Sequence, residues 1–327
     1  MTYVVRRLSF FVVTLWACIT MNFLIPRLMP GNPALDMMAR YQGRISPVAY
    51  KALEVAFGLQ THQSLPAAYV SYLGNLFTGD LGTSLTFFPD SVESVIASAL
   101  PWTLGLVGLT TILPFILGTV VGMIGAWRRG GKLDSLLPPI FIITSAFPYF
   151  WIALLAILVF SINLHWFPLG FGYSNGAHET LTWGFVGDVL RHAILPALTI
   201  LVTSIGGWIL TMRNNMITTL SEDYVSMARA KGLSPGRIMI DYAGRNAILP
   251  NLTGFAMSLG FVVSGAVLVE YVFSYPGVGY MLLEAVDNGD YALMQSLFLL
   301  ITIAVLVAVL ILDFVTFAID PRIRTQS

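Results

Sequence analysis

Charge is scarce in this chain. Only 10% of its 327 residues are charged, against about 25% in an average soluble domain, while 56% are hydrophobic. The formal net charge is zero, which argues against a nucleic-acid-binding protein because such proteins carry a basic excess. The one cysteine, Cys18, lies in an apolar run, so no disulfide can form within the chain. These shortages point to a membrane protein.

Motifs for chemistry of its own are also missing. No G-x-x-x-x-G-K-[ST] phosphate-binding loop occurs, since Lys132 follows two glycines but precedes Leu133. The four histidines lack metal-ligand spacing and are expected in surface loops: His62, His165, His178 and His192. We expect no catalytic residue, no metal and no cofactor on this chain. The alternatives from other classes are an intramembrane enzyme, which would need convergent polar groups within the spans, and a purely structural scaffold.

Long apolar runs are abundant. Windows of about 20 residues, enough to cross roughly 30 Å of hydrocarbon, predict six spans at about 9–29, 99–127, 136–161, 193–213, 252–273 and 293–319. The first is longer than the core of a cleavable signal peptide, and we expect it to be retained. The predicted fold class is an all-α polytopic membrane protein.

Positive charge predicts the orientation of these spans. Twelve of the 17 Lys and Arg residues fall on the side of the termini, and Arg191 alone lies in a short loop on the other side. Because short cytoplasmic loops carry the excess of Lys and Arg, we expect both termini in the cytoplasm. The predicted division is an amino-terminal span (1–30), an extracytoplasmic segment (31–98) with a short helix after Pro66, a five-helix core (99–319) containing a polar loop at 221–250, and a cytoplasmic tail (320–327).

Few residues within the spans suggest specific packing. Gly118 and Gly122 form a GxxxG pair, which can let two helices approach closely. Glu270 and Asp313 lie in or near the last two spans, where a mid-membrane charge costs about 2.5–3.5 kcal/mol. An interfacial or packing role for these carboxylates competes with proton relay.

The polar loop has the pattern of two short helices. Ser221 is a candidate cap for a helix of about ten residues that starts at Glu222 and stops at Gly232. Acidic residues open this helix and basic residues close it, as the helix dipole favours. A second helix is expected from Pro235 toward Asn246. Two competing roles follow for the first helix, whose expected shared face holds Tyr224, Met227 and Ala228: docking to another protein, or packing on the chain's own helix ends.

The chain resembles the permeases of the dipeptide/oligopeptide/nickel family of ATP-binding-cassette importers. ARAKGLS at 228–234 with RNAILP at 245–250 is similar to that family's EAA loop, although residues 222–224 depart from a literal Glu-Ala-Ala. LGNLFTGDLGTS at 73–84, VEYVFSYPGVGYMLLEAV at 269–286, DYALMQ at 290–295 and IDPRIR at 319–324 resemble further signatures in the family's order.

The resemblance implies a type I importer permease of the bacterial or archaeal cytoplasmic membrane. Its expected partners are a second, homologous permease, two ATPases that bind ATP and Mg²⁺, and an extracytoplasmic solute-binding protein. The residues that it assigns to ATPase coupling are Glu222, Asp223, Tyr224, Ala228, Arg229, Ala230, Lys231 and Gly232.

An aromatic-rich turn follows the fifth span. Its candidate pathway or outer-gate residues are Glu270, Phe273, Tyr275, Pro276, Gly277 and Tyr280, and an ordinary interfacial aromatic belt is the competing interpretation. The family's cargo implies an oligopeptide or dipeptide substrate. A cello-, xylo- or chito-oligosaccharide is the alternative, because the loop at 165–190 is rich in aromatic residues.

Overall fold

The computed structural model describes residues 2–28, 64–174, 176, 182–264 and 266–319. Helices dominate, and no strand is named within these ranges. Four helices contain stretches long and apolar enough to cross a membrane: α1 (Thr2–Leu28), α5 (Val92–Trp127), α8 (Trp183–Leu220) and α15 (Tyr291–Ile319). The predicted all-α, polytopic membrane class is confirmed.

The two remaining apolar windows form segmented helices. The window at 136–161 becomes α6 (Lys132–Ala146), α7 (Tyr149–Ala156) and the π-helix η1 (Ile157–Asn163). The break falls at Phe147, which is extended because it precedes Pro148. The window at 252–273 becomes α12 (Leu249–Gly260), the 3₁₀-helix η3 (Val262–Ser264) and α13 (Val267–Val272).

The chain divides into two compact units. The first comprises Met1–Thr103, Val263–Val267 and Pro276–Ser327, and the second comprises Leu104–Val262 and Leu268–Tyr275. Helix α5 starts in the first unit and continues in the second. It begins seven residues earlier than predicted, and α8 begins ten residues earlier, because both helices extend past their apolar windows.

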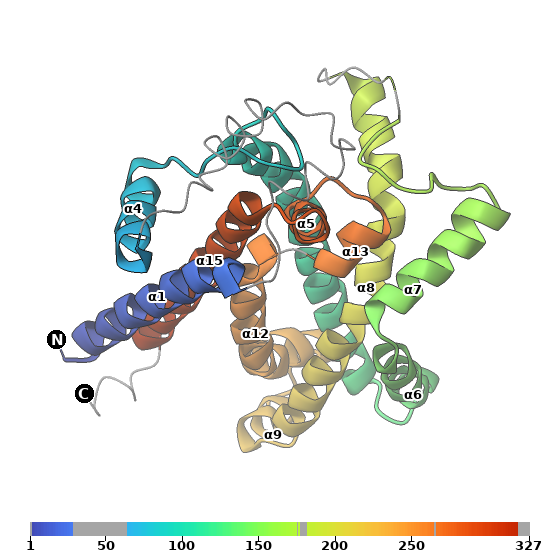
Figure 1. Ribbon diagram of the computed structural model, residues 1–327. Coiled ribbons are helices and arrows are strands. Elements are labelled where there is room, and N and C mark those ends of the chain that lie inside the picture. Colours follow the sequence, from blue (N-terminus) through green and yellow to red (C-terminus); the bar gives the residue numbers. More distant parts are fainter. Residues whose placement is uncertain (1, 29–63, 175, 177–181, 265, 320–327) are drawn as a thin grey trace. The chain divides into compact units, whose positions relative to one another are not determined.

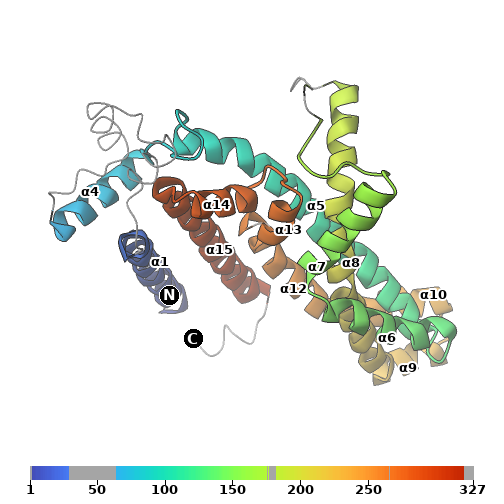
Figure 2. The same cartoon turned by 45° about the vertical axis from the view of Figure 1, so that its right-hand side comes forward.

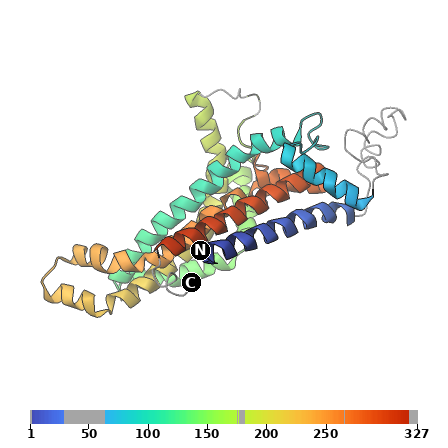
Figure 3. The same ribbon diagram turned by 90° about the vertical axis from the view of Figure 1, so that its left-hand side faces the viewer.

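In the first unit, α1 and α15 run antiparallel, side by side (Figures 1 and 3). Asn22 donates to the carbonyl of Gln295 at 2.6 Å, and the Gln295 amide donates back to the carbonyl of Asn22 at 3.0 Å. Near the other end of the pair, Arg7 forms a 3.0 Å ion pair with Asp313. This ion pair supports the packing role predicted for Asp313 over proton relay.

A second part of the first unit joins α4 (Leu65–Thr78) and α14 (Val278–Asp287) to these helices. The Tyr69 hydroxyl is 2.7 Å from that of Thr20, which fixes α4 beside α1, and α4 is the short helix expected after Pro66. The loop that follows α4 is held by Asp290, which is 1% exposed. Asp290 accepts hydrogen bonds from the Ser84 hydroxyl at 2.6 Å, from the backbone N–H of Thr86 and from that of Leu293. Asp290 therefore caps α15 and also anchors the loop to the start of that helix.

In the second unit, α5 packs tightly against α8 through the predicted glycine pair. A Cβ on Gly118 would lie 2.5 Å from Cβ of Trp208, and one on Gly122 would lie 2.5 Å from the carbonyl oxygen of Ile209. Asn251 of α12 is buried beside this seam and donates to the Thr119 hydroxyl and to the Trp208 carbonyl. The GxxxG pair is thus a packing site, and an amide hydrogen bond joins a third helix to it.

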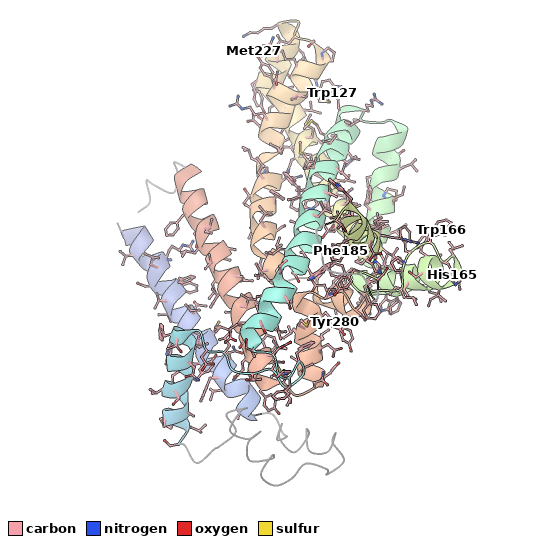
Figure 4. The ribbon with its side chains drawn as sticks, turned by 90° about the horizontal axis from the view of Figure 1, so that it is seen from above. Trp127, His165, Trp166, Phe185, Met227 and Tyr280 are labelled. Atoms are coloured by element: carbon pink, nitrogen blue, oxygen red, sulfur yellow. The ribbon has the colours of Figure 1, made fainter. Side chains whose placement is uncertain are left out.

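The start of α8 carries two of the side chains that sequence placed in a loop. His192 lies on α8, is 7% exposed, and its Nδ1 is 2.9 Å from the carbonyl of Asp188. The expectation of a surface histidine is therefore wrong here, because α8 starts before this residue. Asp188 accepts two hydrogen bonds from Ser174, which ties the preceding loop to the helix. Figure 4 shows His165 and Trp166 in this part of the unit; His62 and His178 lie outside the described residues.

Candidate functional site

The polar loop contains a short, well-bounded helix, α9 (Asp223–Ala230). Glu222 is its N-cap residue, with extended backbone and no side-chain cap. Ser221 was expected in that place, but it ends α8 in an α conformation and its hydroxyl donates to the Thr218 carbonyl. The predicted charge order is correct, with Asp223 in the first turn and Arg229 in the last.

The carboxyl end of α9 is closed by a Schellman motif. Gly232 has φ +73°, a left-handed conformation in which a residue with Cβ is strained. Its N–H donates to the carbonyl of Arg229 at 3.0 Å, and the N–H of Leu233 donates to that of Ala228 at 3.4 Å. The predicted glycine stop is therefore present, and α9 has a fixed end.

One face of α9 is anchored in the core of the second unit. Val225 is fully buried and Ala228 is 2% exposed. We call this core the α9 anchor cluster; its buried members are Ala126, Met212, Met216, Val225, Ala228, Ile238, Ala243 and Ala247. Ala228 therefore packs against the chain's own helix ends. The prediction that Tyr224, Met227 and Ala228 share one face is wrong for Ala228, because the helix turns it inward.

The opposite face of α9 is open. Met227 is 59% exposed and Tyr224 is 37% exposed, and the other candidate coupling residues Glu222, Asp223, Arg229, Ala230, Lys231 and Gly232 are exposed as well. The Tyr224 hydroxyl accepts a 2.8 Å hydrogen bond from the Asn246 amide. The packing alternative is thus correct for the face that holds Ala228, and docking stays a prediction for the open face.

The second half of the loop is less regular than predicted. Instead of one helix it forms α10 (Pro235–Arg237), the π-helix η2 (Ile238–Gly244) and α11 (Arg245–Ala247). A Cβ on Gly244 would lie 2.8 Å from the carbonyl of Met239 and 3.0 Å from Cε of Met123. Gly244, the last residue of the π-helix, therefore lies close to α5. Figure 2 shows α9 and α10 near the same end of the second unit, and Figure 4 labels Met227 and Trp127 there.

The candidate gate residues lie on both sides of the division between the units. In the second unit, Glu270, Phe273 and Tyr275 are buried, and the carbonyl of Phe273 accepts a 2.8 Å hydrogen bond from the N–H of Phe171. Burial argues against a lipid-facing aromatic belt for these three. In the first unit, Gly277 is the N-cap residue of α14, and the N–H of Val278 donates to the Thr103 hydroxyl at 2.7 Å. Pro276 and Tyr280 are half-buried.

Several structural residues were not predicted from the sequence. Asn251, Asp290 and the Asn22–Gln295 pair are polar groups in apolar surroundings, and only their partners, distant in sequence, explain them. A buried polar side chain in an apolar helix is a usable signal, because such a group needs a hydrogen-bond partner. No cluster of three or more metal-ligating side chains occurs in the part of the chain that the structure describes.

Fold and loop together define a helical, multi-pass membrane protein with a capped, anchored helix exposed on one face. Residues 118–325 match the family described as binding-protein-dependent transport system inner membrane component. The chain belongs to this family, whose members are transport permease components of the inner membrane.

Curated relatives match along nearly the whole chain. The oligopeptide transport system permease protein AppB of Bacillus subtilis (strain 168) is 32% identical over 98% of this chain and 99% of its own length. The di/tripeptide transport system permease protein DppB of Pseudomonas aeruginosa (strain UCBPP-PA14) is 32% identical over 100% of this chain and 99% of its own. The oligopeptide transport system permease protein OppB of Haemophilus influenzae is 30% identical over 98% and 99%. The names of these relatives refer to peptides, and none supports the oligosaccharide alternative.

Proposed function

We propose that the chain forms half of the pore of an ATP-driven importer for short peptides. The observation that carries the proposal is α9: a helix rigidly anchored by Val225 and Ala228 that leaves Tyr224 and Met227 open. The chain carries no phosphate-binding loop. The ATPases that drive transport are therefore proposed as separate subunits, and the open face of α9 as their contact.

The proposed topology has six crossings with both termini in the cytoplasm. Four crossings use the long helices, and the other two use the segmented runs α6–η1 and α12–α13. The excess of Lys and Arg on the side of α9 supports a cytoplasmic location for that helix. A second permease of the same family, two ATPases with bound ATP and Mg²⁺, and an extracytoplasmic solute-binding protein complete the proposed assembly.

The proposed mechanism transmits the motion of the ATPases through α9. Its Schellman end and its buried face stop the helix from fraying, so a displacement of α9 is passed to α8 and α5 through the α9 anchor cluster. The buried residues Glu270, Phe273 and Tyr275 are proposed to line the outward end of the pathway. A buried site of this kind opens only when the surrounding helices move.

A peptide is the proposed cargo, supported by the names of the relatives. Uptake of a labelled tripeptide into proteoliposomes that hold the complete transporter, with its binding protein and ATP, tests this proposal. We expect ATP-dependent accumulation of the peptide. Accumulation of a xylo-oligosaccharide in place of the peptide would contradict the assignment.

Cysteine cross-linking tests the contact of α9 directly. Because the sequence holds a single cysteine, a Cys18→Ala background leaves the introduced thiol as the only one in the chain. Met227→Cys should cross-link to an ATPase subunit, with a yield that changes when ATP is added. Ile240→Cys is the matched control, since Ile240 is 56% exposed in the same loop but lies outside α9. Equal yields at the two positions would refute the contact.

A further inference from the structure

A pocket of about 420 Å³ lies in the second unit, where the ends of α5 and α8 meet α9. Its apolar wall consists of Ala126, Trp127, Ile217 and Leu220, and its cationic groups are Arg129 and Arg229. Trp127, Ile217 and Leu220 also pack against the α9 anchor cluster. The pocket therefore contacts three helices and combines an apolar wall with two guanidinium groups.

Neither Arg129 nor Arg229 has an ion-pair partner among the described residues. Both arginines are exposed. The carboxylates nearest to Arg229 in sequence, Glu222 and Asp223, are not among the pocket's lining residues. Two guanidinium groups beside one pocket favour an anion with several acceptor oxygens, because each can donate two parallel hydrogen bonds.

The apolar lengths of α5 and α8 indicate that the pocket lies at the depth of the lipid headgroups. Gly122 contacts α8 at Met212 and Arg213, and Arg213 is the charge that ends the uncharged stretch 193–212 of α8. Trp127 follows Gly122 by five residues and Ile217 follows Arg213 by four, a rise of about 6–8 Å along each helix. A headgroup layer is roughly 5–7 Å thick on each side of the hydrocarbon. A tryptophan at this level is typical of the membrane interface.

We propose that this pocket binds the phosphate of an anionic phospholipid. Arg129 and Arg229 hold the phosphate oxygens, while the glycerol and upper acyl carbons lie against Trp127, Ile217 and Leu220. The proposal rests on the proposed cytoplasmic location of α9, because the cytoplasmic leaflet supplies anionic lipid. The bound lipid bridges α5, α8 and α9, and so it stiffens the connection through which α9 acts on the spans.

Trp127 itself provides the probe. Purified permease in phosphatidylcholine nanodiscs is given equal mole fractions of brominated phosphatidylglycerol or brominated phosphatidylcholine, and tryptophan quenching is measured. The chain has seven tryptophans, so the signal of the pocket is the difference between the wild type and Trp127→Phe. We expect stronger quenching of Trp127 by the anionic lipid. Equal quenching of this Trp127 signal by the two lipids would overturn the proposal.

Arginine variants test the cationic groups. An interfacial Lys or Arg contributes about 1 kcal/mol toward anionic lipid, equivalent to about fivefold in affinity. Arg129→Gln and Arg229→Gln should each weaken binding about fivefold, and the double variant about 30-fold. Arg237→Gln is the matched control, because it removes one positive charge from the same loop outside this pocket. A control that weakens binding as much as the single variants would contradict a specific site.

Three further outcomes separate the possible occupants. Relief of quenching by millimolar inorganic phosphate would assign the pocket to soluble phosphate and overturn the lipid assignment. A double variant that keeps its lipid preference but no longer captures the ATPases would assign the arginines to the ATPase interface instead. Lipid preference that depends on the arginines, in a chain that supports no ATP-driven uptake, would count against the proposed function and leave the lipid site standing.

Discussion

Replacement of Val225 by alanine tests whether α9 works as an anchored helix. The side chain is fully buried in the α9 anchor cluster, and the change removes two carbon atoms from it. At about 0.8 kcal/mol for each buried CH₂, the lost transfer free energy is about 1.6 kcal/mol. The residual cavity adds to this, so about 2 kcal/mol is a reasonable total. Local opening of α9 then becomes about 30-fold more frequent.

Hydrogen exchange measured by mass spectrometry on peptides covering residues 223–231 reports this opening. Val225→Ala should lower the amide protection of residues 223–231 about 30-fold. It should also reduce the amount of substrate transported for each ATP hydrolysed. Met227→Ala is the matched control: Met227 is 59% exposed on the same helix, so protection should be unchanged while capture of the ATPases weakens. Unchanged protection in Val225→Ala, or equal losses in both variants, would refute the anchored-helix argument.

Three other predictions concern the two units. Gly122→Ala should lower the free energy of unfolding by about 1–3 kcal/mol, because its Cβ would meet the backbone of α8. Gly105→Ala is the control, because a Cβ there has nothing within 4 Å and should not destabilise the protein. Thermal denaturation in detergent compares the two variants. Asp290→Ala leaves three donors unpaired and should cost about 2–4 kcal/mol, seen as faster proteolysis of the loop after α4. Asp313→Asn should keep ATP-driven uptake and change stability by less than about 1 kcal/mol, since its pair with Arg7 is partly exposed; abolished uptake would revive proton relay.

The sequence was sufficient where one local rule decided the outcome. Apolar length identified the four long apolar helices, Gly232 ended α9 because the left-handed turn favours glycine, and the GxxxG pair marked a real helix contact. The class and family followed from these features together with the motifs. The broken helices were harder, since Pro148 signals a break but its neighbours decide whether the helix kinks or stops.

The sequence did not predict which face of α9 is buried, because the helical period alone allows either face to be buried. Tyr224 and Ala228 are one turn apart, yet the hydroxyl of Tyr224 reaches Asn246 while Ala228 enters the core. Ser221 is a good N-cap by residue type, but α8 continues through Leu220, and Ser221 is the C-cap residue of that helix instead. In each case, a residue distant in sequence or a neighbouring helix outweighed the local preference.

The pairing of α1 with α15 has a consequence for biosynthesis. Asn22 and Gln295 are 273 residues apart, and ribosomes add about 5–20 residues per second. The amide of Asn22 therefore enters the bilayer roughly 14–55 s before its partner has been made. During that interval α1 lacks its partner helix α15, and the amide of Asn22 lacks the carbonyl that accepts its hydrogen bond in the folded chain. The hydrogen bonds between Asn22 and Gln295 can therefore form only after the last helix, α15, has been synthesised.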